Sequence, residues 1–180
     1  MRTEQLRQEF ELEIRWTVFP LHPDTPEEGL ELEELFAGRI DVPAAMRRMK
    51  TVAAELGLPL GDRTRTYNSR NAQELGKWAE QQGVGDLFKT AIYHAYFVEG
   101  RNIAKTDELG GIAESIGLSA PQALLALKQK DFAATVDADW ARCRELGVTS
   151  VPSHIYQNRS LVGFQDYPAF NRLITGVPTI

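Results

Sequence analysis

Side chains with reactive chemistry are few and widely spaced in this sequence of 180 residues. Cys143 is the single cysteine, so the chain by itself forms no internal disulfide. It is expected in the middle of a helix, where its spacing from Val136 and Trp140 places it on a packing face. We therefore interpret Cys143 as a small core residue rather than a nucleophile. The three histidines lack metal-ligand spacing, and no metal site is predicted.

Two histidines are nevertheless candidates for contact with a ligand. His154 follows Pro152 by two residues, at a strand position where it is either a plain surface residue or a polar group facing a ligand. His22 lies between two prolines and is interpreted first as a turn residue. His94 lies on an apolar helix, where an interior or interface position is expected.

Polar residues also mark the starts of two predicted helices. Asn68, Ser69 and Arg70 open one of them, and capping by Ser69 explains this pattern without any function. Gln165 and Asp166 precede the last predicted helix, and Asp166 is its expected N-cap.

Composition favours an ordinary globular chain of one domain, or of one domain with an inserted subdomain. Hydrophobic residues make up 43% and charged residues 25%, and the net charge of −5 argues against nucleic-acid or anionic-membrane partners. No apolar run approaches the roughly 20 residues of a membrane span, and the first residues lack a signal-peptide pattern. With one cysteine, we expect a cytoplasmic protein.

The hydrophobic pattern predicts an α/β order of elements. A short helix over residues 3–10 is followed by strict alternation over residues 11–19, which predicts a strand. Helical periodicity then continues to Gly147, where a left-handed cap is expected. Beyond it, Val151 and Pro152 lead into a predicted strand over residues 153–156, a turn at residues 158–160, a strand over residues 161–164 and a helix from Asp166.

Four short sequences in this order carry a family resemblance: F-P-L-H-P at residues 19–23, Y-N-S-R-N-A at 67–72, A-Y-F-V-E-G at 95–100, and G-V-T-S-V-P at 147–152. Together they resemble the FrnE-type, DsbA-like oxidoreductases, which are cytoplasmic thioredoxin-fold proteins related to glutathione-dependent 2-hydroxychromene-2-carboxylate isomerases. The resemblance implies an α/β thioredoxin-like fold with a helical insertion and a cis proline at Pro152. The expected parts are residues 1–26 and 131–180 for the thioredoxin-like domain and residues 27–130 for the insertion.

The chain departs from that family at its start. The family's first strand and Cys-Pro-x-Cys turn precede the first helix, and neither is found here. No catalytic residue is therefore assigned in this chain. The absent strand belongs at the centre of the sheet, between residues 11–19 and 153–156, so we expect either a native start upstream of Met1 or a truncated form with a weakened or repaired sheet.

The leading hypothesis is a thiol–disulfide oxidoreductase whose dithiol is not in this chain, acting on a peptide or small-molecule thiol or disulfide. One alternative is a glutathione-using isomerase or transferase, and another is a binding module without catalysis. No cofactor is required, and glutathione is an alternative ligand. A homodimer that covers an exposed strand edge is a further hypothesis. The resemblance implies these substrate-binding residues: Val151, Pro152, Ser153, His154, His22, Asn68, Gln165 and Asp166.

Overall fold

The computed structural model describes residues 2–177, and its contacts divide the chain into two units. Unit 1 consists of Met1–Leu21 with Ala138–Ile180, and unit 2 consists of His22–Asp137. The predicted insertion, residues 27–130, lies within unit 2.

Unit 2 is mainly helical, as the periodicity predicts. Its two short strands pair antiparallel, with Leu30 opposite Thr66. Asp41 begins α3 as an N-cap, because its carboxylate accepts a hydrogen bond from the Ala44 N–H at 2.8 Å. The elements in chain order are β1 (Leu30–Glu31), α2 (Leu32–Phe36), α3 (Val42–Glu55), β2 (Arg65–Thr66), α4 (Arg70–Gln81), α5 (Gly85–Phe97), α6 (Thr106–Ser115), α7 (Ala120–Gln129) and the start of α8 (Ala133–Glu145).

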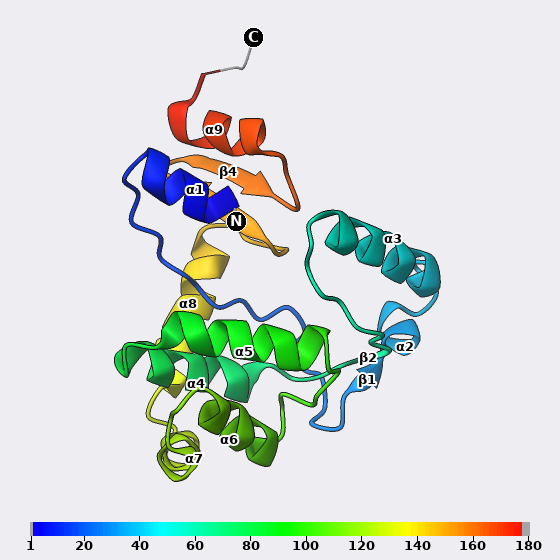
Figure 1. Ribbon diagram of the computed structural model, residues 1–180, viewed down its shortest axis with the longest axis vertical. Helices are drawn as coiled ribbons and strands as arrows, with labels where there is room; N and C mark the ends of the chain where they lie inside the picture. The colour runs from blue at the N-terminus through cyan, green and yellow to red at the C-terminus, as the bar shows by residue number, and fades with distance from the viewer. Residues whose placement is uncertain (1, 178–180) are drawn as a thin grey trace. The chain divides into compact units, whose positions relative to one another are not determined.

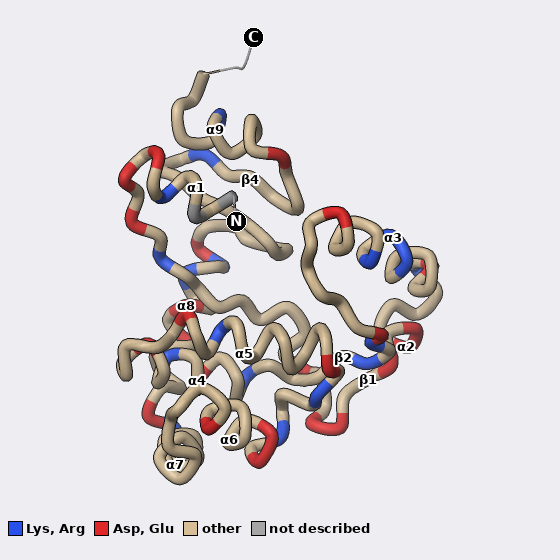
Figure 2. Tube along the Cα trace, viewed as in Figure 1, with Lys and Arg blue, Asp and Glu red and all other residues tan. Residues whose placement is uncertain are grey.

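The core of unit 2 is formed by α4, α5, α6 and α7, which pack together in Figure 1. Each of these helices turns one apolar stripe inward, as expected for amphipathic helices around a shared core. Figure 2 shows acidic residues around β1 and α2 and basic residues along α3. The buried core residues are Ala72, Leu75, Trp78, Ala79, Phe88, Ile92, Ala95, Ile103, Leu109, Ile112, Ala113, Ala123 and Ala126.

Unit 1 is a β-hairpin with helices. It contains α1 (Arg2–Glu9), the C-terminal part of α8, and the antiparallel strands β3 (Ser153–Tyr156) and β4 (Arg159–Val162). The last helix, α9 (Tyr167–Thr175), packs on both strands and also contacts α1 (Figure 1). The buried apolar residues of unit 1 are Leu6, Cys143, Ala169, Phe170 and Leu173.

The strand predicted over residues 11–19 is wrong, because residues 12–20 have no regular secondary structure. The alternation is partly visible, since Leu12 and Ile14 are half-buried, but Trp16 is 47% exposed. No strand among the described residues pairs with this segment. Its backbone bonds to side chains of α8 instead, and a ladder cannot form without a neighbouring strand.

The predicted hairpin is confirmed, but its turn lies earlier in the chain. Tyr156 is opposite Arg159, so Gln157 and Asn158 form a two-residue turn, and β4 begins at Arg159 rather than at Leu161. Gln157 has a positive φ of 55°, which tight hairpin turns require. The sequence suggested a later turn because Asn158 is the stronger turn former.

Candidate functional site

The Val151–Pro152 loop is positioned by the end of α8. Gly147 has a φ of 67°, and the helix closes with hydrogen bonds from the Gly147 N–H to the Arg144 carbonyl (3.0 Å) and from the Val148 N–H to the Cys143 carbonyl (2.9 Å). This pair of backbone hydrogen bonds is typical of a glycine C-cap, and it confirms the predicted helix end. It turns the chain out of the helix and into the loop.

The peptide bond between Val151 and Pro152 is cis, the geometry that the resemblance implies. Two hydrogen bonds hold the loop on the hairpin. The Gly163 N–H donates to the Pro152 carbonyl at 2.8 Å, and the Ser153 hydroxyl donates to the Ser150 carbonyl at 2.7 Å. The Ser153 side chain therefore shapes the loop through its bond to Ser150.

Apolar side chains surround this loop on its solvent side. Val151 is 48% exposed, and Pro152 is also exposed. The hairpin adds Ile155, Val162 and Phe164, which are 39%, 50% and 60% exposed. Strand alternation predicts that Ile155 and Val162 share the face turned away from α9. Unit 1 thus presents an apolar surface beside a proline loop.

His154 faces the other side of the hairpin. Its ring lies edge-on to the Phe170 ring of α9, with 4.6 Å between the ring centroids. The ring is half-buried, and its Nδ1 atom is buried with no hydrogen-bond partner among the described residues. Burial lowers the pKa of His154, and a hydrogen bond with the Leu161 backbone opposes that shift. His154 is therefore directed toward α9, not toward the exposed surface of the Val151–Pro152 loop.

Gln165 and Asp166 lie at the start of α9, where both side chains satisfy backbone groups. The Asp166 carboxylate accepts a hydrogen bond from the Ala169 N–H at 2.9 Å, which confirms Asp166 as the N-cap. The Gln165 amide donates to the Val162 carbonyl at 2.9 Å, which joins the end of β4 to the helix. An acidic side chain therefore already occupies the positive end of this helix.

The remaining two predicted residues, His22 and Asn68, belong to unit 2. His22 is half-buried beside Phe36, with ring centroids 6.5 Å apart, and burial lowers its pKa. The Asn68 amide donates to the carbonyls of Pro23 and Thr25 at 2.8 and 2.9 Å. Asn68 thereby fixes the turn that follows His22, so the structure brings these two regions together.

The start of α4 differs from the predicted one. Ser69 occupies the N-cap position but makes no side-chain capping bond. The side-chain oxygen of Asn68, Oδ1, accepts a hydrogen bond from the Arg70 N–H at 2.9 Å instead. Asn68 and Arg70 also line a polar hollow of about 230 Å³ with Glu27, Asn71 and Ala104. The Arg70 guanidinium already donates hydrogen bonds to the carboxylates of Glu74 and Asp137, at 2.5 and 2.6 Å.

Cys143 is buried, as its spacing predicts. Its thiol lies 3.7 Å from the Val18 carbonyl. Burial and the nearby Asp139 carboxylate raise the pKa of Cys143, and Arg142 and Arg144 lower it less strongly. A buried thiol with a raised pKa is a poor nucleophile. The described residues also contain no cluster of side chains suited to a metal ion.

Sequence reasoning missed the role of Asp139, a side chain only 2% exposed. Its carboxylate accepts hydrogen bonds from Arg15 at 3.2 Å and from the Val18 N–H at 3.1 Å. A single acid within a charged helical stretch has no distinguishing pattern, because its partners are more than a hundred residues away in the chain.

None of the helices in residues 2–177 has the length and apolar character needed to cross a membrane.

Comparisons with known proteins agree with this arrangement. Among solved structures, the chain is similar to a probable DsbA oxidoreductase from Streptomyces coelicolor, with a TM-score of 0.84 and 20% identity over 97% of this chain and 81% of that one. It is similar to 2-hydroxychromene-2-carboxylate isomerase, with a TM-score of 0.64 and 17% identity over 96% and 82% of the two chains. It is also similar to the cytosolic disulfide reductase DsbM from Pseudomonas aeruginosa with GSH, with a TM-score of 0.53 and 22% identity over 74% and 68%.

No curated protein sequence matches the chain. The structural likenesses show the fold, which is thioredoxin-like with a helical insertion. The model of the DSBA-like thioredoxin domain matches residues 1–175, nearly the whole sequence. This chain therefore belongs to the DSBA-like thioredoxin domain family.

Proposed function

We propose that this chain is the substrate-binding part of a FrnE-type thiol–disulfide oxidoreductase. In this proposal it binds an extended thiol- or disulfide-bearing peptide at the exposed Val151–Pro152 loop that leads into β3. The observation that carries the proposal is the exposed Val151–Pro152 loop, which lies beside exposed apolar side chains of the hairpin. A cytoplasmic location belongs to the same proposal.

The direction of the backbone groups follows from the hairpin register. In an antiparallel pair, residues alternate between those bonded to the partner strand and those pointing away from it. The Pro152 carbonyl accepts a bond from Gly163 on the β4 side. The backbone N–H and C=O groups of His154 and Tyr156 therefore also point toward β4, and those of Ser153 and Ile155 point away from it. Among the described residues, no other strand pairs with that outer edge of β3. The same outer edge continues into the exposed Val151–Pro152 loop, where the backbone of an extended peptide would bond as in recognition by strand addition.

The chemistry of disulfide exchange needs two sulfurs within bonding reach of each other. Cys143 is the single cysteine, and it is buried with a raised pKa. In this proposal Cys143 takes no part in exchange, and the sulfur chemistry comes from a dithiol that these 180 residues do not contain. The contribution of this chain is to hold the substrate backbone.

Binding of a fluorescently labelled extended peptide, followed by anisotropy, tests the proposal. We expect saturable binding that is lost when alternate backbone amides of the peptide are N-methylated, and kept when the other set of amides is methylated. Val151→Ser should weaken binding, whereas Leu87→Ser, at a leucine 58% exposed on α5, should not. Binding that ignores backbone methylation would contradict strand addition.

A glutathione-dependent isomerase is the second candidate, because the chain has the fold of 2-hydroxychromene-2-carboxylate isomerase and of DsbM with GSH. In this alternative, the start of α9 would receive the γ-glutamyl carboxylate of glutathione. The Asp166 carboxylate already bonds there, which argues against it. Glutathione that binds and displaces the labelled peptide would favour the isomerase, and peptide binding without glutathione binding favours the oxidoreductase.

A binding module without catalysis predicts the same peptide binding. Reduction of a disulfide-bonded test protein by material purified from the native source separates the two, because only the oxidoreductase predicts activity there. A homodimer through the edge of β3 would compete with the peptide. Sedimentation at increasing protein concentration would then show self-association that added peptide reverses.

A further inference from the structure

We infer that α3 and its neighbour α2 form a surface that binds a second copy of this chain. Both helices belong to unit 2, and α2 is the main neighbour of α3 among the helices and strands. Three features of the described residues support the inference: an open apolar stripe on α3, arginines on α3 without partners, and glutamates on α2 without partners. The surface contains no residue of the Val151–Pro152 loop.

The apolar side chains of α3 form one stripe whose middle is open to solvent. A helix packed on a core buries such a stripe, as α4 does with Leu75 and Trp78, which are 1% and 7% exposed. In α3, Val42 is buried, but Met49 and Leu56 are 46% and 44% exposed. The members of the stripe, which recur at helical spacing, are Val42, Ala45, Met46, Met49, Val52, Ala53 and Leu56.

Exposed charges without partners lie on both helices, and their signs are opposite. The guanidinium groups of Arg47 and Arg48 on α3 have no hydrogen-bond or ion-pair partner among the described residues. The same is true of the Glu33 and Glu34 carboxylates on α2. Figure 2 shows the basic residues of α3 and the acidic residues of α2 on these neighbouring helices. Each set of charges is therefore available to a complementary surface.

A surface that carries both signs side by side is complementary to itself. In a two-fold contact a patch meets the same patch of the partner, so each α3 would lie on the α2 of the other copy. Both sets of ion pairs would form together, and the open stripes would be covered between them. An acidic protein or an anionic membrane would match the arginines of α3 but would be repelled by the glutamates of α2. The charge pattern thus favours a second copy.

The size of this surface predicts a weak dimer. A helix of 14 residues is about 21 Å long and about 10 Å wide, so α3 offers roughly 200 Å². Even with α2 added, the contact is smaller than the roughly 800 Å² that each partner buries in a standard interface. Each copy also has a net charge of −5, which opposes association. We expect a dissociation constant on the order of 100 µM.

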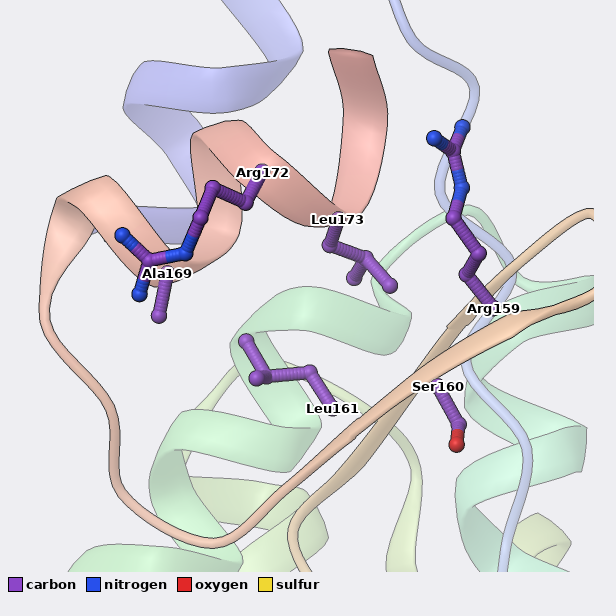
Figure 3. Close-up of a pocket in the computed structure, with 6 residues that line it drawn as sticks. All are labelled: Arg159, Ser160, Leu161, Ala169, Arg172 and Leu173. Atoms are coloured by element: carbon purple, nitrogen blue, oxygen red, sulfur yellow. The ribbon is translucent and has the colours of Figure 1, made fainter. Parts of the chain in front are cut away.

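The hollow between β4 and α9 in unit 1 does not combine charge and apolar surface in this way. Figure 3 shows the guanidinium groups of Arg159 and Arg172 directed away from its apolar middle. The Arg159 guanidinium already donates to the Ile174 carbonyl at 2.7 Å and lies over the Tyr156 ring. The surface of α2 and α3 is therefore the better docking site.

Sedimentation of the whole chain at increasing concentration, up to about 1 mM, tests the inference. We expect reversible dimerisation that Met49→Glu weakens about tenfold or more, because it places a charge in the middle of the stripe. Leu125→Glu, at a leucine 50% exposed on α7, is the matched control and should not change it. An added extended peptide should leave this dimer intact, whereas it would dissociate a dimer formed through β3.

Reversal of the charges tests which surfaces meet. One variant combines Arg47→Glu with Arg48→Glu, and the other combines Glu33→Lys with Glu34→Lys; each alone should dimerise about tenfold more weakly or worse. An equimolar mixture of the two should recover dimerisation, because each α3 then faces an α2 of opposite charge. Both variants keep a negative net charge, so opposite net charges cannot explain the recovery.

Three results would overturn the inference. The first is a chain that stays monomeric up to about 1 mM, whether unit 1 or an acidic protein covers α3. The second is a dimer that Met49→Glu leaves unchanged while circular dichroism shows a folded protein. The third is a mixture of the two charge-reversed variants that dimerises no better than either variant alone.

Discussion

Replacing Asp139 by alanine should detach residues 12–18 from α8. Asp139 is 2% exposed, and its two carboxylate oxygens accept hydrogen bonds from the Arg15 guanidinium and from the Val18 N–H. The Cys143 thiol, one turn along the same helix, lies 3.7 Å from the Val18 carbonyl. No strand among the described residues pairs with this segment, and side chains of α8 bond to it directly.

The two contacts of Asp139 should contribute unequally. Arg15 is 66% exposed, so solvent screens this ion pair, and exposed pairs contribute about 0–1 kcal/mol. The bond from the Val18 N–H to a buried carboxylate belongs to the stronger class of about 1.5–3 kcal/mol. We therefore expect Asp139→Ala to lower the free energy of unfolding by about 1.5–4 kcal/mol. Arg15→Gln should lower it by about 1 kcal/mol or less.

Urea denaturation of the two single variants and the double variant measures these differences. The coupling energy from this cycle isolates the ion pair and should be small. Hydrogen exchange at the Val18 amide should accelerate in Asp139→Ala but change little in Arg15→Gln. Asp131→Ala, at an exposed acid ahead of α8, is the matched control and should stay within about 0.5 kcal/mol of the wild type. An equal loss in Arg15→Gln and Asp139→Ala, or unchanged exchange at Val18, would refute this reasoning.

Three further predictions concern the pH response, a helix cap and a close backbone contact. Burial lowers the pKa values of His154 and His22 below their ordinary 6.5, so the folded state favours the neutral rings; stability should be complete above pH 6.5 and decline as the pH falls below it. His154→Leu should remove part of that decline in urea titrations between pH 5 and 7, and a flat wild-type curve would contradict it. Asp166→Ala removes the N-cap of α9 and should cost about 1 kcal/mol in thermal unfolding, whereas Asp166→Ser should retain most of the stability. A Cβ at Gly61 would lie 2.0 Å from the Val98 carbonyl oxygen, so Gly61→Ala should destabilise by about 1–3 kcal/mol or more. Gly76→Ala, where the nearest heavy atom is 4.0 Å away, is the control and should be neutral or stabilising by equilibrium denaturation.

Local patterns were sufficient for the helices and their ends. Asp166 acts as an N-cap and Gly147 as a C-cap, as predicted, because a cap depends on groups within four or five residues. The burial of Cys143 also followed from its spacing along a helix. The family resemblance implied the thioredoxin-like fold and the proline loop, which spacing alone would not have identified.

The prediction failed where pairing partners decide the conformation. Residues 11–19 have the alternation of a strand, yet a strand exists only where a neighbouring strand bonds to it. Here Arg15 and Val18 bond to Asp139 of α8 instead. The same reason explains Asn68, which caps α4 in place of Ser69 while its amide reaches two carbonyls more than forty residues away. Such contacts leave no periodic signal in the chain.

The sequence by itself determined the helical periodicity, the N-cap at Asp166, the C-cap at Gly147 and the presence of a single cysteine. These properties depend on side chains that are neighbours along the chain or one turn apart. Only the tertiary structure decided that Asp139 holds the segment around Val18 and that His154 turns toward Phe170. Each of these depends on groups brought together by folding, since burial and hydrogen-bond partners are set in three dimensions.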